Sequence, residues 1–323
     1  MPDRILFIRL SSLGDIVLTA PVIAAARARY PEARIDFCTK AEYVGIVKLL
    51  PGLDNIIEVQ KEVMNEARNE IASNEYDAII DLHNNIRSRE LTRGLKKLSR
   101  VNKRTMRRWL MVKTKRNWMR GQPDVIGRYF EAASRLLEIK DDGQAPHLPA
   151  LTSNAKRVAI CPGSKHWNKK WPIEYYIAVA QYLQSRGYQI ELFGSSEDRD
   201  VCAEIRQAVP NAIDHAGEFS LEELPAAIAQ FEFAITNDSG LMHLASAVRV
   251  PTLSFFGPTV RAFGFAPRSS QATILENKGL YCRPCTRIGL DRCPEKHFRC
   301  MREITPDKAI VQIETLLRDR SSA

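Results

Sequence analysis

Short apolar runs of strand length alternate with helix-like segments along almost the whole chain, and this alternation limits the possible folds most. The strand-like runs are residues 4–9, 34–39, 56–59 and 77–82, followed by 157–161, 189–193, 231–236 and 252–256. The helix-like segments are residues 16–30, 42–50, 63–73 and 124–139, followed by 173–186, 197–209, 221–230, 241–247 and 305–318. Strands separated by helices pair in parallel, so the pattern predicts an α/β fold with crossover helices.

A linker divides the chain near its middle. Residues 141–149 combine glycine, proline and polar side chains, and the alternation restarts after them. We therefore predict two α/β domains, residues 1–145 and residues 150–305. The terminal helical segment, residues 306–323, is long enough to pack back on the first domain.

The composition restricts the class of protein and its partners. With 323 residues, of which 45% are hydrophobic and 26% charged, the chain has room for two ordinary cores. No apolar run has the length of a membrane span, and we expect a cytoplasmic protein. The formal charge of +9 favours anionic partners: nucleotides, phosphorylated lipids, a membrane surface or nucleic acid.

A polar turn at residues 237–240 follows one strand-like run and precedes a buried helix. The free N–H groups at the start of a helix suit a phosphate, and Gly240 lets a ligand approach the backbone closely. Asp238 brings a carboxylate to the same place, which suits a sugar hydroxyl. The alternative is an N-capped buried helix that binds no ligand.

Three further loops of the second half also fall at strand ends. Residues 162–172 offer small residues such as Ser164 and a cation, Lys169, for phosphate charge. Glu197 follows the next strand, where it can accept from a ribose or base, and Gly257 opens the last loop. Four such loops at successive strand ends of one sheet indicate a crevice for a nucleotide diphosphate. The alternative is that these glycines only make tight strand-to-helix turns.

The loop after the first strand-like run carries candidate catalytic groups. Ser11, Ser12, Gly14 and Asp15 lie at the carboxyl end of the first predicted strand, where ligands of open α/β sheets gather. The loop lacks the GxGxxG pattern, which argues against a dinucleotide-dependent dehydrogenase. The alternative role for Asp15 is capping of the following helix. His83 follows another predicted strand. The two interpretations of this residue are a substrate contact and a polar cap, and we prefer the cap.

Residues 87–120 are strongly basic. They contain fourteen Lys or Arg residues and one acid, with Trp109 and Trp118 interleaved. Such a run is usually a solvated basic face, but tryptophans beside cations suit a membrane interface or a stacking partner. We expect this segment to bind an anionic partner.

The seven cysteines of a cytoplasmic chain are expected to be thiols or metal ligands rather than disulfides. Four of them follow the pattern C-x2-C-x7-C-x6-C: Cys282, Cys285, Cys293 and Cys300. This spacing allows a structural zinc site, with His297 as a rival ligand. Free thiols or a local disulfide are the alternatives.

Four stretches resemble the lipopolysaccharide heptosyltransferases, glycosyltransferase family 9. They are RLSSLGDIVLTAP at residues 9–21, CPGS…KKWP at 161–172, TNDSGLMH at 236–243 and FGPT at 256–259. The resemblance implies the GT-B fold: two Rossmann-like domains with parallel sheets facing across a cleft, the acceptor domain first and the donor domain second. It also implies inverting transfer of a heptose from ADP-heptose to the lipid A–Kdo inner core of lipopolysaccharide, without a metal or other cofactor.

The resemblance also assigns roles to residues. Asp15 matches the proposed general base, and Lys169 matches a lysine that faces the donor phosphates. The expected donor-binding residues are Lys169, Glu197, Asp238, Ser239, Gly240, His243, Ser164 and Gly257. The expected acceptor-binding residues are Ser11, Ser12, Gly14, Arg87, Arg104, Arg107, Arg108 and Lys113. The cysteine-rich residues 281–301 depart from the pattern of the best-known members, which leaves the exact sugar and acceptor position open.

Two other functions remain open from the sequence. One is a sibling glycosyltransferase that uses a different nucleotide sugar or acceptor, and the other is a nucleic-acid binding protein that uses the basic segment. Under the leading interpretation we expect a monomer with no nucleic-acid partner. It would be bound peripherally to the inner face of the cytoplasmic membrane, where its anionic lipid acceptor lies.

Overall fold

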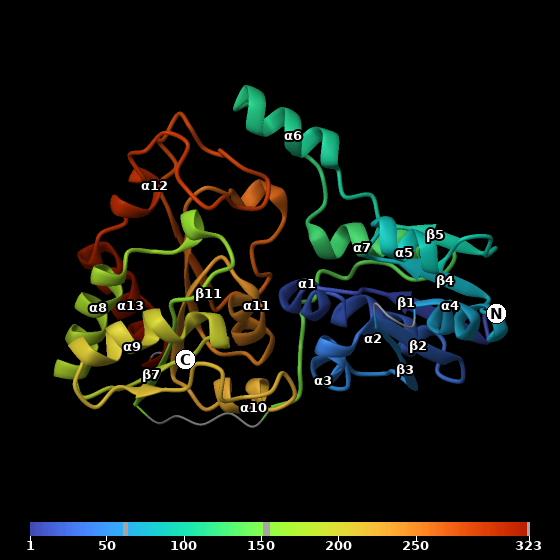
Figure 1. Ribbon diagram of the computed structural model, residues 1–323, viewed down its shortest axis with the longest axis horizontal. Coiled ribbons are helices and arrows are strands. Elements are labelled where there is room, and N and C mark those ends of the chain that lie inside the picture. Colours follow the sequence, from blue (N-terminus) through green and yellow to red (C-terminus); the bar gives the residue numbers. More distant parts are fainter. Residues whose placement is uncertain (61–63, 151–155, 322–323) are drawn as a thin grey trace. The chain divides into compact units, whose positions relative to one another are not determined.

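The computed structural model describes residues 1–60, 64–150 and 156–321, and these form two compact units (Figure 1). The first unit comprises Met1–Thr105 and Gln122–Pro149. The second comprises Met106–Gly121 and the described residues from Ala150 onward. We expected residues 1–145 to form one domain, but the segment Met106–Gly121 belongs to the second unit instead.

The first unit is built on a parallel sheet with the strand order β3-β2-β1-β4-β5. Its strands are β1 (Arg4–Ile8), β2 (Arg34–Lys40), β3 (Asn55–Val59), β4 (Ala78–Asp81) and β5 (Leu98–Arg100). Its helices are α1 (Leu13–Val17), α2 (Ala20–Arg29), η1 (Ala41–Tyr43), α3 (Val44–Val47), α4 (Met64–Ser73), α5 (Ile86–Leu91) and α7 (Val125–Ala133).

Strand β1 is buried on both faces, which explains its unbroken apolar sequence. Leu6 and Ile8, two residues apart and therefore on the same face, pack with Ile71 of α4 and Leu91 of α5. The strand aligns in parallel with β2 on one side and β4 on the other. The first strand of the unit thus lies in the middle of the sheet.

The second unit is built on a parallel sheet with the strand order β11-β10-β9-β6-β7-β8. Its strands are β6 (Arg157–Cys161), β7 (Gln189–Leu192), β8 (Ile213–Asp214), β9 (Phe233–Asn237), β10 (Thr252–Phe256) and β11 (Ala272–Glu276). Its helices are α6 (Thr105–Thr114), η2 (Trp167–Lys169), α8 (Ile173–Ser185), η3 (Ser196–Asp198), α9 (Arg199–Ala208), α10 (Leu224–Ile228), α11 (Gly240–Ala247), η4 (Arg261–Phe263), α12 (Arg299–Arg302) and α13 (Pro306–Ser321).

The terminal helix α13 packs against α8 of its own unit, whereas its length had suggested a return to the first domain. Ala309 and Ile313 of α13 are buried in the same core cluster as Trp171. The Trp171 ring stacks on Phe255 at 4.0 Å between centroids, and its indole N–H donates to the carbonyl of Ile304 at 2.8 Å. These contacts fix the end of the chain to the second sheet.

Several elements were not predicted or begin elsewhere. Strand β5 and helices α5 and α6 lie in the basic stretch, whose charged residues obscure any apolar period. Strands β8 and β11 are edge strands that are short or half-exposed. The predicted helix 16–30 is divided into α1 and α2, with Pro21 in the first turn of α2, where its missing N–H costs nothing. The predicted helix start at Val63 lies outside the described residues.

The two sheets share one topology. In each, the first strand is central, the next two lie on one side and the later strands on the other. The direction of winding therefore reverses between β1 and β4 and again between β6 and β9. Loops at the carboxyl ends of strands diverge at such a reversal, and ligands of α/β sheets bind there. Among the helices of the described residues, none combines the length and apolar content needed to cross a membrane.

Candidate functional site

The reversal point of the first unit holds an ion pair between Arg9 and Asp15. The Arg9 guanidinium lies 2.7 Å from Oδ2 of Asp15, and Ser12 Oγ donates to the same oxygen at 3.1 Å. Arg9 is only 7% exposed, and it also donates to the carbonyls of Ser11 at 2.7 Å and Leu82 at 2.6 Å. Asp15 lies in the first turn of α1, whose N-cap is Ser12. Asp15 is therefore not the cap residue, and its carboxylate is held at the end of β1.

Two buried side chains, Tyr129 and His83, lie near the Arg9–Asp15 pair. The Tyr129 hydroxyl is 3.5 Å from the carbonyl oxygen of Asp15, and burial raises the pKa of Tyr129. Nδ1 of His83 accepts the Leu10 N–H at 3.2 Å, and burial, assisted by nearby Arg9, lowers the pKa of His83 to about 3. His83 is thus a neutral side chain that binds the backbone of the loop after β1.

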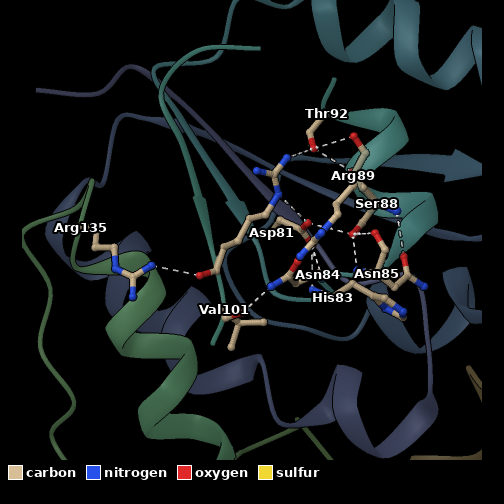
Figure 2. Close-up of polar contacts among 10 residues, drawn as sticks. Asp81, His83, Asn84, Asn85, Ser88, Arg89, Thr92, Val101 and Arg135 are labelled. Carbon is tan, nitrogen blue, oxygen red and sulfur yellow. Dashed lines mark hydrogen bonds and ion pairs between the residues drawn. The ribbon is translucent and has the colours of Figure 1, made fainter. Parts of the chain in front are cut away.

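A fully buried carboxylate, Asp81, fixes the loop after β4 (Figure 2). Its Oδ1 accepts the N–H groups of His83 at 2.9 Å and Asn84 at 2.7 Å, and its Oδ2 accepts Ser88 Oγ at 2.8 Å. Arg100 of β5 lies 3.6 Å from Oδ2. We did not predict this network, although the Asn85-x-x-Ser88 spacing at the start of α5 is a capping-box signal.

The reversal point of the second unit brings Lys169 and Asp238 together, two of the predicted donor-binding residues. Lys169 Nζ lies 2.7 Å from Oδ2 of Asp238, and Thr259 Oγ1 donates to the same oxygen at 2.7 Å. Lys169 belongs to the loop after β6, Asp238 follows β9 and Thr259 follows β10. One carboxylate therefore joins three of the four loops that the sequence placed at strand ends.

Asn237, at the end of β9, holds the loop that carries Lys169. Its side-chain N–H donates to the carbonyl of Pro162 at 2.7 Å, and its Oδ1 accepts the Trp171 N–H at 2.9 Å and the Tyr176 hydroxyl at 3.0 Å. The amide thus binds both ends of the 162–171 loop. We predicted Asn237 only as a turn residue, since these partners lie more than sixty positions away.

The predicted polar turn at residues 237–240 leads into the start of α11. Ser239 is the N-cap residue, yet its side chain makes no capping hydrogen bond. Its Oγ is buried and has no hydrogen-bond partner in the part of the chain that the structure describes. Gly240 opens the helix, and His243 is buried one turn later.

The remaining predicted donor residues follow other strands of the same sheet. Ser164 follows β6, and Glu197 is exposed in η3 after β7. Gly257 follows β10 and has a packing reason of its own, because a Cβ there would lie 2.8 Å from Cε of Met301. A side chain at Gly257 would therefore have to displace Met301, whether or not a ligand approaches this position.

One Asp-x-Asp sequence, Asp198-Arg-Asp200, has the spacing of a metal-binding acidic pair. Asp198 Oδ2 accepts both the N–H and the hydroxyl of Ser195, at 2.9 and 2.8 Å. Its side chain also fills the space where a Cβ on Gly163 or Gly194 would lie. Asp198 is thus engaged in fixing the loops after β6 and β7.

The predicted acceptor-binding cations are divided between the two units. Arg87 is exposed in α5 of the first unit, and Arg104 pairs there with Glu131 at 2.8 Å. Arg107, Arg108 and Lys113 lie on α6 in the second unit. Their role in binding an acceptor stays a prediction.

The cysteine-rich segment does not support the zinc prediction. Among the described residues, the structure has no group of three or more His, Cys, Asp or Glu side chains arranged to hold a metal. Cys282 Sγ lies 3.8 Å from Nε2 of His297, and all seven cysteines are free thiols. Burial raises the pKa of Cys285 to about 11 and that of Cys300 to about 12, so both thiols are protonated near neutral pH.

A family model described as glycosyltransferase family 9 (heptosyltransferase) matches residues 64–296, well over half of the chain. The chain belongs to glycosyltransferase family 9. Membership confirms both the resemblance found in the sequence and the prediction of a glycosyltransferase.

Relatives of this family 9 chain match it almost end to end. Lipooligosaccharide heptosyltransferase 2 of Haemophilus influenzae is 27% identical, over 97% of this chain and 99% of its own. The solved structure of Escherichia coli ADP-heptose lipopolysaccharide heptosyltransferase II has a TM-score of 0.79 at 22% identity, covering 98% and 99% of the two chains. An E. coli heptosyltransferase with ADP has a TM-score of 0.75 at 18% identity, covering 97% and 99%. These likenesses confirm the predicted GT-B class of α/β fold with two parallel sheets.

Replacing Arg9 by Met should lower the free energy of unfolding by about 3 kcal/mol, measured by urea denaturation. The variant leaves the Asp15 carboxylate and the carbonyls of Ser11 and Leu82 without their shared donor, and breaking a buried pair is costly. The control Arg29→Gln removes an exposed pair and should cost less than about 1 kcal/mol. Equal losses would contradict the anchoring role of Arg9.

Acidification should destabilise the protein through His83. Its pKa is about 3 when folded and about 6.5 when unfolded. Between these values the unfolded chain binds a proton that the folded chain does not. Stability is therefore complete above pH 6.5 and should fall by about 2 kcal/mol by pH 5.

The variant His83→Asn, whose Oδ1 can accept the Leu10 N–H, should lose this part of the pH dependence in urea titrations. His147→Asn, which changes an exposed histidine, should keep it. A pH dependence unchanged in His83→Asn would show that other groups cause the acid sensitivity.

Proposed function

We propose that this family 9 glycosyltransferase moves a heptose from ADP-heptose to the lipid A–Kdo inner core of lipopolysaccharide. The observation that carries the proposal is the pair of reversal-point sites, with a held carboxylate in one unit and a lysine beside a helix start in the other. The names of the matching proteins, lipooligosaccharide and ADP-heptose lipopolysaccharide heptosyltransferases, support the choice of donor and acceptor.

Asp15 is the proposed general base. The acceptor hydroxyl attacks the anomeric carbon, its proton passes to the Asp15 carboxylate, and the bond from that carbon to the diphosphate oxygen breaks. Attack from the face opposite the leaving diphosphate inverts the anomeric centre. The Arg9 guanidinium and Ser12 Oγ both bind Oδ2 of this carboxylate, which holds the proposed base in one orientation.

The second unit is proposed to bind the donor and stabilise the leaving group. The departing ADP gains negative charge, which Lys169 and the N–H groups at the start of α11 can offset. In the free protein Asp238 already neutralises Lys169. The lysine is therefore held at the loop end before the diphosphate arrives, and a metal ion is not required by this scheme.

The cellular setting follows from the proposed acceptor. We propose a monomeric cytoplasmic protein that works at the inner face of the cytoplasmic membrane, with no nucleic-acid partner. A thermal-shift screen with ADP-heptose against UDP-, GDP- and other ADP-sugars tests the donor, since a bound ligand stabilises by mass action. Stabilisation by a different nucleotide sugar alone would favour the sibling-enzyme alternative.

Asp15→Asn should lower turnover by about a hundredfold or more, because the amide cannot take the acceptor proton. The dissociation constant of ADP-heptose should stay nearly unchanged, because Asp15 belongs to the unit that lacks Lys169. Transfer is measured with EDTA present, and donor binding by calorimetry. Glu32→Gln, which alters an exposed acid of the same unit, is the control and should retain turnover. Undiminished transfer by Asp15→Asn would remove Asp15 from the base role.

Lys169→Met should raise the dissociation constant of ADP-heptose about ten- to hundredfold, through loss of a charge-assisted hydrogen bond to phosphate. Binding of the uncharged nucleoside adenosine should change little. Lys170→Met, which removes the adjacent lysine, is the matched control and should bind the donor normally. An unchanged constant in a folded Lys169 variant would refute the phosphate contact.

A further inference from the structure

Residues 106–121, here called the basic arm, pack on the second unit although both flanking segments belong to the first (Figure 1). Arg108 donates to the carbonyl of Arg287 at 2.5 Å, and Lys115 Nζ donates to that of Pro284 at 2.8 Å. Backbone carbonyls of one loop thus bind two cations of the arm. The loop formed by residues 284–299 is here called the adjoining loop.

Aromatic and aliphatic contacts complete the attachment. The Arg108 guanidinium lies 5.0 Å from the centre of the Phe263 ring and 5.5 Å from that of Phe265. Met111 and Met119 of the arm are buried in one cluster with Phe263. One face of the arm is therefore fixed to the second unit, and the other face is left for solvent or a partner.

The outward face of α6 combines apolar and cationic side chains. Met106, Trp109 and Lys113 are spaced i, i+3 and i+7 and so share one face of the helix, away from Arg108 and Met111. Met106 is 67% exposed and Trp109 is 43% exposed. An exposed apolar stripe flanked by cations is the pattern of an interfacial helix.

The adjoining loop extends this surface. Within this loop Ile288 is 62% exposed and Leu290 is 36% exposed, and Trp118 at the far end of the arm is 41% exposed. Since Arg108 and Lys115 bind the backbone of this loop, the exposed apolar side chains of the two segments belong to one region of the second unit.

The formal charge of the protein is concentrated in the same region. The whole chain contains 47 Lys or Arg and 38 Asp or Glu. The basic arm and the adjoining loop contain ten Lys or Arg and two Asp or Glu, a net charge of +8. The other residues therefore contain 37 Lys or Arg and 36 Asp or Glu, and are nearly neutral. A patch that holds almost the entire net charge attracts an anionic surface.

We propose that the basic arm and the adjoining loop form one docking surface for an anionic lipid bilayer. This inference rests on the proposed function only in that a lipid acceptor requires the enzyme to reach a membrane. Lys113, Arg116 and Arg120 face the lipid phosphates, while Met106, Trp109 and Ile288 enter the headgroup boundary. Aliphatic side chains such as Met106 and Ile288 have no ring to stack on a base, which favours a bilayer over nucleic acid.

Vesicle co-sedimentation tests this surface without donor or acceptor. The protein should bind phosphatidylcholine vesicles that contain about 30% phosphatidylglycerol far more tightly than vesicles of phosphatidylcholine alone. Binding should weaken when NaCl rises from about 0.1 M to about 0.5 M, because salt screens exposed charges.

Two variants separate the charge from the apolar contribution. Lys113→Gln/Arg116→Gln/Arg120→Gln should reduce the partition coefficient about a hundredfold, at roughly fivefold for each cation removed. Trp109→Ser/Trp118→Ser should reduce it about tenfold or more. The matched control Lys156→Gln/Arg186→Gln/Arg206→Gln removes three exposed cations elsewhere in the second unit and should lower binding much less.

Equal losses in the arm variant and the control would overturn the proposal, since net charge alone would then explain binding. Tighter binding of the wild-type protein to a single-stranded oligonucleotide than to the anionic vesicles would also overturn it. Vesicle binding without heptose transfer would leave the docking surface standing and contradict only the proposed function. Heptose transfer without vesicle binding would overturn the docking surface and leave the proposed function standing.

Discussion

The edge of a parallel sheet is the constraint on which this structure depends. All strands of such a sheet end at the same edge, and where the winding reverses the following loops separate and leave room for polar groups. Both units use this geometry, between β1 and β4 and between β6 and β9. The candidate base Asp15 and the Lys169–Asp238 pair each lie at one of these positions.

Buried polar side chains then determine the shape of the loops at these edges. Arg9 and Asn237 each bind backbone groups of a loop that is distant in sequence, and Asp81 binds those of the loop that directly follows it. A buried charge or amide without partners would be strongly destabilising, so each of these side chains specifies one loop conformation. The flanking candidate residues, Asp15 and Lys169, are held in place by neighbours that take no direct part in the proposed chemistry.

The basic arm shows a different use of the same physical rules. It is too polar to build a core of its own, and its buried apolar area comes from Met111 and Met119, with Val112 partly buried against the same cluster. Its attachment depends instead on two cations that bind carbonyls of the adjoining loop and on aromatic rings beneath Arg108. This arrangement orients the remaining cations and tryptophans outward, where they give the second unit its strongly basic surface.

Most of the fold could be predicted from the sequence, because strands buried on both faces are continuous apolar runs. The predicted strand at residues 157–161 coincides with β6, and the predicted strands at residues 34–39 and 252–256 agree with β2 and β10 within one residue. The strand-end loops that carry the candidate site residues were also located, since turn residues and short polar motifs are local signals. Charge density concealed β5 and α6, whose apolar positions are too few to produce a period.

The sequence by itself determined the two α/β halves, the family to which the chain belongs and the loops in which its candidate residues lie. Only the tertiary structure decided that Arg9 pairs with Asp15, that Asp238 joins Lys169 to Thr259, and that the basic arm packs on the second unit. The physical reason is that strand and turn propensities act within a few residues. The Lys169–Asp238 ion pair and the hydrogen bond from Arg108 to the carbonyl of Arg287 instead depend on partners 69 and 179 positions apart, which only the folded chain brings together.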